Sequence, residues 1–234
     1  MSDFATNLKN LRERIARAEQ AAGRPSGQVR LLAVSKTQPA AAVRQAFAAG
    51  QAAFGENYVQ EGVAKVQALA DLPLEWHFIG PLQSNKTREV AEHFAWIHSV
   101  DRDKIARRLA EQRPARLPPL QVCLQVNIDD EAGKSGCAPA DLPALVAAVL
   151  ALPRLELRGL MCIPRPGNGA AFADLAKTRQ ELLASIPGLS PDRFDTLSMG
   201  MSDDLDAAIA AGSTLVRIGT ALFGARAAAA SAGR

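Results

Sequence analysis

Hydrophobic residues along this chain fall into short continuous runs that alternate with segments of helical periodicity. The runs occupy residues 29–35, 52–54, 75–79, 96–100, 120–127, 155–163, 194–199 and 214–218. They are apolar throughout instead of alternating with polar residues, which is typical of parallel strands that are covered on both faces. The pattern therefore predicts about eight β/α units.

Segments of helical periodicity separate the predicted strands. The first places Phe4, Leu8 and Leu11 at helical spacing and stops near Gly23, so the chain opens with an additional helix. Further helices are predicted over residues 39–50, 58–69, 102–112, 142–150, 173–185 and 203–211. This alternation in 234 residues matches a single (β/α)8 TIM barrel better than an open doubly wound sheet. We expect one barrel domain over residues 1–226 and a disordered tail over residues 227–234.

Composition and charge narrow the class of protein. The 27 basic and 24 acidic residues are spread along the chain without a basic block, so nucleic acid is not an expected partner. The three cysteines have no metal-ligand spacing and are expected to be small core side chains. No apolar run is long enough to cross a membrane, and no targeting segment is recognised at the start of the chain. We expect a cytoplasmic protein without a metal site.

Polar side chains concentrate where the predicted strands end. Lys36, Asn57, Ser198 and Arg217 lie at strand exits, whereas strand entries such as residues 211–212 have no polar side chains. All strand exits of a (β/α)8 barrel open onto one face, and the active sites of this fold lie on that face. These side chains are therefore expected to converge although they are distant in sequence.

The segment over residues 213–220 carries a candidate anion site. Arg217 lies near the end of the last apolar run, and Gly219 and Thr220 then open a turn whose N–H groups can face a phosphate. Because strand side chains alternate between faces, Arg217 and Gly219 are expected to point to the same side. The alternative is a structural role, in which Arg217 pairs with a carboxylate and Gly219 merely ends the strand.

Lys36 is the candidate nucleophile. At the end of an apolar strand it is expected to be partly desolvated, which favours a neutral amine that can form a Schiff base with an aldehyde. The alternative is a lysine whose stem covers the strand end while its ammonium stays in water. An amine, a phosphate-binding turn and an arginine together suit pyridoxal 5′-phosphate (PLP), which needs anchors for its aldehyde, phosphate and ring nitrogen. An arginine has donors only, so it would keep that nitrogen unprotonated and disfavour deep carbanion stabilisation.

Five motifs resemble those of the YggS/PROSC family of pyridoxal phosphate homeostasis proteins. They are AVSKT (33–37), FGENYVQE (54–61), WHFIGPLQSNK (76–86), LSMGMSDD (197–204) and RIGT (217–220). The resemblance runs from about the first helix to Arg226. It implies a fold-type III barrel like the N-terminal domain of alanine racemase, with PLP held as an aldimine on Lys36.

The resemblance also implies roles for the other residues of these motifs. Arg217 faces the ring nitrogen, while Gly219, Thr220 and a preceding serine bind the phosphate. Ser198 and Ser202 both lie in the matching motif, and their spacing does not distinguish them. The remaining implied contacts are a polar neighbour of the ring at Asn57 and a wall of the site at Met199.

A binding protein is implied rather than an enzyme, and no catalytic residue is assigned. A racemase of this type needs a second base, which resembling enzymes take from a tyrosine of an added domain, and the only tyrosine here is Tyr58. We expect a monomer that carries PLP in intracellular vitamin B6 homeostasis, with PLP-dependent apo-enzymes as recipients. Two alternatives stay open: a low-efficiency PLP-dependent amino-acid racemase or lyase, and a cofactor-free barrel enzyme that acts on a sugar phosphate.

Overall fold

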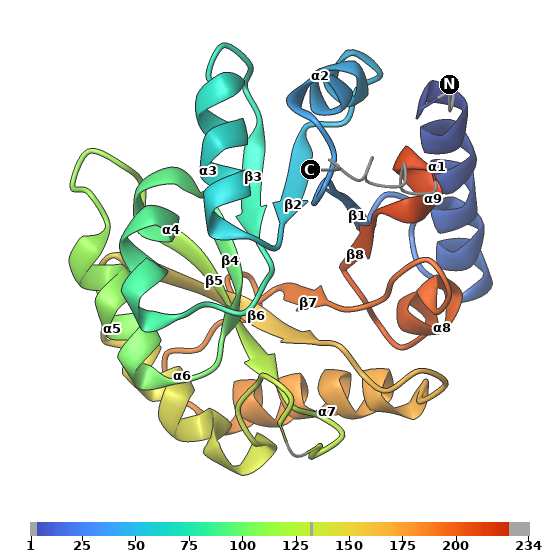
Figure 1. The fold of residues 1–234 in the computed structure, drawn as a ribbon. Helices are drawn as coiled ribbons and strands as arrows, with labels where there is room; N and C mark the ends of the chain where they lie inside the picture. The colour runs from blue at the N-terminus through green and yellow to red at the C-terminus, as the bar shows by residue number, and fades with distance from the viewer. Residues whose placement is uncertain (1–3, 132, 225–234) are drawn as a thin grey trace.

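The apolar runs pair side by side in chain order, and the last strand returns to pair with the first. The computed structural model, which describes residues 4–131 and 133–224, contains a closed barrel of parallel strands in this order (Figure 1). The strands are β1 (Arg30–Val34), β2 (Ala53–Glu56), β3 (Glu75–Phe78), β4 (Trp96–Val100), β5 (Leu120–Val126), β6 (Leu155–Cys162), β7 (Thr196–Ser198) and β8 (Leu215–Ile218). The predicted (β/α)8 barrel is confirmed.

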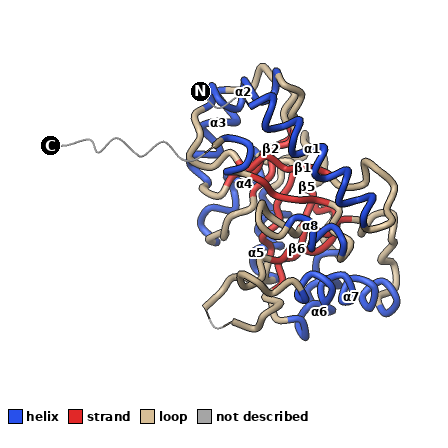
Figure 2. The backbone as a smooth tube through the Cα atoms, turned by 90° about the vertical axis from the view of Figure 1, so that its right-hand side faces the viewer, coloured by secondary structure: helices blue, strands red, loops and turns tan. Residues whose placement is uncertain are grey.

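Helices surround the strands on the outside of the barrel (Figure 2). They are α1 (Phe4–Ala21), α2 (Ala40–Ala48), α3 (Val59–Ala68), α4 (Thr87–His93), α5 (Asp103–Gln112), α6 (Leu142–Leu150), α7 (Ala170–Ser185), α8 (Leu205–Ala210) and α9 (Thr220–Phe223), with short 3-10 helices η1 (Ser84–Lys86) and η2 (Pro139–Asp141). The sequence pattern missed α4, because this short helix buries few apolar side chains. The predicted tail over residues 227–234 lies outside the described residues.

The additional helix α1 packs against α8 and α9, beside the junction of β8 and β1 (Figure 1). Its buried face carries Leu8, Leu11 and Ile15, as the periodicity predicts. Near its end, the buried Glu19 carboxylate accepts N–H bonds from Gly27 and Val29 at 2.9 and 2.7 Å. A buried carboxylate must be hydrogen-bonded, so this contact fixes the path of the chain into β1.

Apolar side chains pack on both sides of the strands. The outer layer, between strands and helices, contains the largest fully buried side chains, among them Phe54, Phe78, Phe94, Phe172 and Phe194. Two smaller clusters are made of Leu32, Ile79 and Leu215, and of Trp96, Cys123 and Met161. These clusters lie on the inward-facing side of the strands, so the barrel is a packed core rather than a pore.

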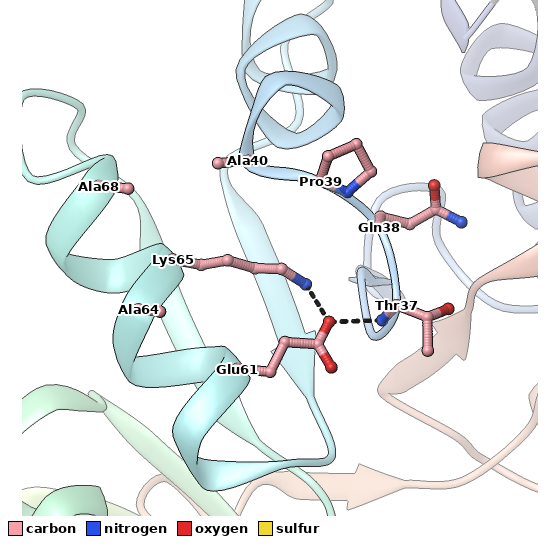
Figure 3. Close-up of a pocket in the computed structure, with 8 residues that line it drawn as sticks. All are labelled: Thr37, Gln38, Pro39, Ala40, Glu61, Ala64, Lys65 and Ala68. Atoms are coloured by element: carbon pink, nitrogen blue, oxygen red, sulfur yellow. Dashed lines mark hydrogen bonds and ion pairs between the residues drawn. The ribbon is translucent and has the colours of Figure 1, made fainter. Parts of the chain in front are cut away.

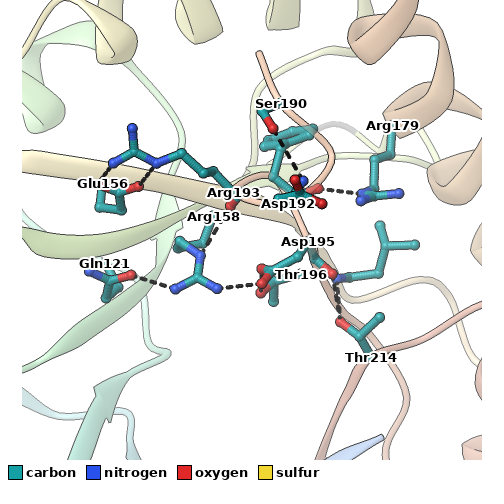
Figure 4. Close-up of polar contacts among 12 residues, drawn as sticks. Gln121, Glu156, Arg158, Arg179, Ser190, Asp192, Arg193, Asp195, Thr196 and Thr214 are labelled. Carbon is teal, nitrogen blue, oxygen red and sulfur yellow. Dashed lines mark hydrogen bonds and ion pairs between the residues drawn. The ribbon is translucent and has the colours of Figure 1, made fainter. Parts of the chain in front are cut away.

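Charged side chains close the end of the barrel where the strands begin, an arrangement the sequence pattern did not predict. Arg158 donates to Gln121 at 2.8 Å and pairs with Asp195 (Figure 4). The same guanidinium lies 5.2 Å from the centre of the Trp96 ring, and Arg30 lies 5.7 Å from it. Because this end is occupied by paired charges, the opposite face is the one left open for a ligand.

Replacing Gly159 by alanine tests how closely β6 and β7 approach. An added Cβ would lie 1.8 Å from the Thr196 carbonyl oxygen, so the strands would have to move apart. We expect the free energy of unfolding, measured by urea denaturation, to fall by at least about 2 kcal/mol. Gly169→Ala is the control, because its Cβ would meet only the Ala207 Cβ at 4.0 Å. An equal loss of unfolding free energy for the two substitutions would contradict the close approach of β6 and β7.

Candidate functional site

The closure of the barrel brings Lys36 next to the turn after β8. β1 and β8 pair in parallel, with Ala33 opposite Ile218, so the segments that leave these two strands are neighbours. Lys36, Gly219 and Thr220 line one small pocket of about 40 Å³. The structure thus brings these three predicted site residues together.

The turn after β8 lies close to β1 and has backbone N–H groups without an acceptor in the described part of the chain. A Cβ added to Gly219 would lie 3.2 Å from the Val34 carbonyl oxygen, so glycine lets this turn lie close to β1 without a shift of the backbone. Within the described residues, the N–H groups of Thr220 and Ala221 donate to no protein acceptor. Free backbone N–H groups at such a turn are good donors to phosphate oxygens.

Lys36 and Lys65 lie near the same loop but differ in their partners. The Lys65 ammonium donates to the Ser35 carbonyl at 2.6 Å and to carboxylate oxygens of Glu56 at 2.8 Å and Glu61 at 2.7 Å, which uses all three of its protons. Lys36 is half-buried and has no hydrogen bond or ion pair within residues 4–131 and 133–224. Lys36 is therefore the lysine whose amine is free to react.

A clamp made of Glu56, Glu61 and Lys65, of which Glu56 and Lys65 are buried, holds the backbone on both sides of Lys36. Before it, the Ser35 hydroxyl donates to Glu56 at 2.5 Å. After it, the Thr37 N–H donates to Glu61 at 2.5 Å, in the pocket of about 490 Å³ between α2 and α3 (Figure 3). Thr37 has a φ of 64°, which is strained for a β-branched residue and is found mostly where function requires it. The clamp thus fixes the position from which the Lys36 side chain starts.

Glu56 is the most buried member of this clamp. It has no exposed surface, and burial raises the pKa of its carboxyl group against the opposing effects of the Lys65 and Ser35 hydrogen bonds. Its Oε2 atom has no hydrogen-bond partner in the described part of the chain. The ion pair with Lys65 is therefore needed to keep this carboxylate charged.

Arg217 enters the interior of the barrel from β8. Its Nη1 donates to the Ser198 carbonyl at 2.5 Å and to the Ser198 hydroxyl at 2.9 Å, and its Nη2 donates to the Cys162 carbonyl at 2.9 Å. Burial lowers the pKa of the guanidinium. No carboxylate pairs with it among the described ion pairs, in contrast to the structural alternative considered for the sequence. Of its five N–H donors, the N–H at Nε and one at Nη2 are left for a ligand.

The two candidate serines lie in different surroundings. Ser198 is fully buried, and its hydroxyl contacts both Arg217 and His98. Ser202 is half-buried just before α8, and its carbonyl accepts a bond from Arg14 at 2.9 Å. The Ser198 hydroxyl is therefore hydrogen-bonded inside the barrel, whereas the Ser202 hydroxyl has no partner within the described residues.

Asn57 and Met199 complete the predicted set. Asn57 lines a pocket of about 670 Å³ together with Tyr58 and Arg102, and its buried Oδ1 has no partner within the described residues. Met199 packs instead in the apolar layer between strands and helices. Because Ser198 points into the barrel, the next residue along the strand points out. The structure thus does not place the Met199 side chain beside Arg217.

The cysteines, metal ligands and helix lengths can be described in the same residues. All three cysteines are buried and free, and burial raises the pKa of each thiol to about 12. Among the described residues there is no group of three or more histidine, cysteine or acidic side chains arranged to hold a metal. No helix in the described ranges has the length and apolar character needed to span a membrane.

Comparison with known proteins first defines a class. The alanine racemase N-terminal domain family matches residues 6–227. Alanine racemase from Corynebacterium glutamicum has a TM-score of 0.65 at 17% identity, over 95% of this chain and 61% of the racemase chain, which is a likeness of fold alone. The barrel is of the alanine racemase type.

Relatives that match along their whole length define the family. The pyridoxal phosphate homeostasis protein of Pseudomonas aeruginosa is 64% identical over 228 residues, which is 97% of each chain. The one from Escherichia coli K12 is 55% identical over 231 residues, covering 97% of this chain and 98% of that protein. PipY from Synechococcus elongatus has been solved with PLP bound, at 44% identity and a TM-score of 0.78 over 90% of this chain and 100% of PipY. This chain belongs to the pyridoxal phosphate homeostasis protein family, as its motifs predict.

Replacing Lys65 by methionine tests the clamp. The substitution leaves the Glu56 carboxylate buried without a counter-charge, which should lower the free energy of unfolding by about 3–5 kcal/mol in urea denaturation at neutral pH. Because burial raises the pKa of Glu56, the folded state holds a proton on it more tightly than the unfolded chain does. The loss should therefore shrink as the pH falls.

The double variant Lys65→Met with Glu56→Gln is the matched control, because it removes both charges. It should recover most of the lost stability. A double variant no more stable than Lys65→Met would show that the ion pair is not the source of the effect.

Proposed function

We propose that this protein binds PLP as a Schiff base on Lys36 and acts in intracellular PLP homeostasis as a carrier without robust catalytic activity. The observation that carries the proposal is the contrast between two lysines at one loop: Lys65 donates to three acceptors, while Lys36, beside the turn after β8, has no partner among the described residues. PipY, 44% identical, supports it because that relative has been solved with PLP bound.

The free donors and acceptors of the site fit the cofactor's functional groups. When bound, PLP supplies an electrophilic aldehyde carbon and a ring that accepts electrons. In our proposal Lys36 holds the aldehyde carbon, and the N–H groups at Thr220 and Ala221 bind the phosphate. Arg217 directs its remaining donors at the ring nitrogen, and the unpartnered Asn57 oxygen lies at the edge of the ring.

Arg217 supports the choice of a carrier over an enzyme. A guanidinium has no acceptor and stays charged, so it cannot share a proton with the ring nitrogen in the way a carboxylate does. A ring whose nitrogen is unprotonated is a weaker electron sink, which slows chemistry at the carbon attached to the amine. Tyr58, the only tyrosine of the chain, is 57% exposed, which suits a surface residue better than a second base.

A carrier needs recipients, and we propose PLP-dependent apo-enzymes for this role, with the protein acting as a monomer. A Schiff base is reversible, so an amine of a recipient enzyme can take the cofactor from Lys36. This proposal differs from a low-efficiency racemase or lyase in one observable: a carrier exchanges the cofactor but does not exchange the α-proton of an amino acid.

Lys36→Ala should abolish the visible absorption of the PLP-loaded protein, because no other amine at the loop is free. Lys36→Arg should do the same while keeping the positive charge, since a guanidinium does not form a Schiff base under these conditions. Borohydride reduction followed by peptide mapping should place the cofactor on Lys36 in the unmodified protein. Lys104→Ala, an exposed residue of α5, is the control and should keep the absorption.

Two results would contradict parts of this proposal. Unchanged visible absorption in Lys36→Ala would show that the Schiff base forms elsewhere. Appreciable incorporation of deuterium at the α-carbon of added amino acids would show that the protein is a catalyst rather than only a carrier.

Gly219→Ala should weaken the phosphate contact selectively. The added Cβ would press on the Val34 carbonyl at 3.2 Å and move the turn away from β1. We expect the affinity for PLP to fall about tenfold, and the affinity for pyridoxal, which lacks the phosphate, to stay unchanged. Absorption titrations with both ligands measure this, and an equal loss for the two would show that the turn does not bind the phosphate.

A further inference from the structure

A line of five hydrogen-bonded polar side chains crosses the interior of the barrel and ends at Arg217. Glu75, at the start of β3, contacts His77 with 2.8 Å between Oε1 and Nε2. His77 Nδ1 lies 2.8 Å from His98 Nε2, and His98 Nδ1 lies 2.8 Å from the Ser198 hydroxyl. The same hydroxyl is 2.9 Å from Arg217 Nη1. His77, His98 and Ser198 have no exposed surface, so their polar atoms depend on one another.

The groups in this line have defined charges. Burial alone would raise the pKa of Glu75, but the His77 hydrogen bond and the charge of Arg30 outweigh it and lower this pKa to about 2. Burial lowers the pKa of His77 against the effect of Glu75. Burial also lowers the pKa of His98 well below its usual value, with the neighbouring His77, Arg217 and Arg30 adding to the shift. The line therefore joins a carboxylate, two neutral imidazoles, a hydroxyl and a guanidinium.

These charges allow a single arrangement of protons. The Glu75 carboxylate only accepts, so His77 donates from Nε2 and must accept at Nδ1 from His98. The other nitrogen of His98 is then an acceptor, and Ser198 must donate its hydroxyl proton to it. The Ser198 oxygen therefore presents only lone pairs to Arg217. In the opposite tautomer of His98, the lone pairs of His77 Nδ1 and His98 Nε2 would face each other at 2.8 Å with no proton between them.

We propose that Ser198 and His98 are positioning residues that hold the Arg217 guanidinium in place for the cofactor ring, an inference that rests on the proposed function. Ser198 holds Nη1 through its carbonyl and its hydroxyl, and the Cys162 carbonyl holds Nη2. This arrangement directs the remaining N–H groups at the ring nitrogen. His98 acts one step further back: by accepting the Ser198 proton, it fixes the rotation of the hydroxyl so that a lone pair of its oxygen faces Arg217.

The arrangement also decides between the two serines of the matching motif. A phosphate oxygen accepts hydrogen bonds, so its protein ligand must have a proton to donate. Ser198 has given its only hydroxyl proton to His98. Ser202, whose hydroxyl has no partner within residues 4–131 and 133–224, is therefore the serine that we assign to the phosphate.

The affinities of Ser198→Ala for PLP and for pyridoxal distinguish a role in positioning Arg217 from a role in binding the phosphate. If the Arg217 guanidinium is held less firmly, the affinity for each ligand should fall about tenfold, because both ligands have the ring nitrogen. Ser213→Ala is the matched control: its hydroxyl is equally buried and donates to the Met199 carbonyl at 2.7 Å, outside the line. It should leave both affinities unchanged. A loss for PLP alone would make Ser198 a phosphate ligand and overturn the proposal, as would no loss at all.

The proton arrangement itself can be measured in the cofactor-free protein. Long-range proton–nitrogen NMR of the three histidine rings should show neutral rings protonated at Nε2 for His77 and His98, with His93 assigned through His93→Gln. An Nδ1–H tautomer of His98 would overturn the proposal. His98→Gln, which keeps a donor and an acceptor, should bind pyridoxal more tightly than His98→Leu. A natural protein that binds no PLP would instead contradict the proposed function, while the tautomers stay measurable.

Discussion

Hydrogen bonding between the first and the last strand is the constraint on which the site depends. Because Leu32 lies opposite Arg217 and Ala33 opposite Ile218, the loop after β1 meets the turn after β8. Neither segment has a binding site by itself: one has an amine, and the other has free N–H groups and a guanidinium. Ion pairs occupy the other end of the barrel, so the face with the strand exits is the one left open.

Two buried polar systems serve this junction in different ways. Outside the barrel, Lys65 and two carboxylates hold the backbone on either side of Lys36, and the cost of burying these charges is offset by their mutual contacts. Inside the barrel, neutral histidines connect a carboxylate at one end to Arg217 near the other. The first system positions the atom that would form a covalent bond, and the second orients the group that would face the ring.

The fold could be predicted from the sequence because fully apolar strands and regular helical segments alternate along the whole chain. Lys36, Gly219 and Thr220 could be predicted to converge because strand exits share one face of this fold. The clamp could not: Glu61 and Lys65, four residues apart on α3, look like a pair on a solvated helix face. The roles of Ser198 and Met199 depend on which side of β7 each one faces, and that register is visible only in the folded chain.

The position of the candidate site at the seam between β1 and β8 makes the site dependent on closure of the barrel. During synthesis β1 is the first strand to emerge and β8 the last. Lys36 is therefore synthesised long before the turn at Gly219 and Thr220 beside which it lies. A nascent chain without β8 has neither the turn nor Arg217, and a ligand that needs both ends of the seam binds only the closed barrel. By mass action such a ligand stabilises the finished protein over every shorter intermediate. Occupancy of the seam by such a ligand would therefore report that the barrel has closed.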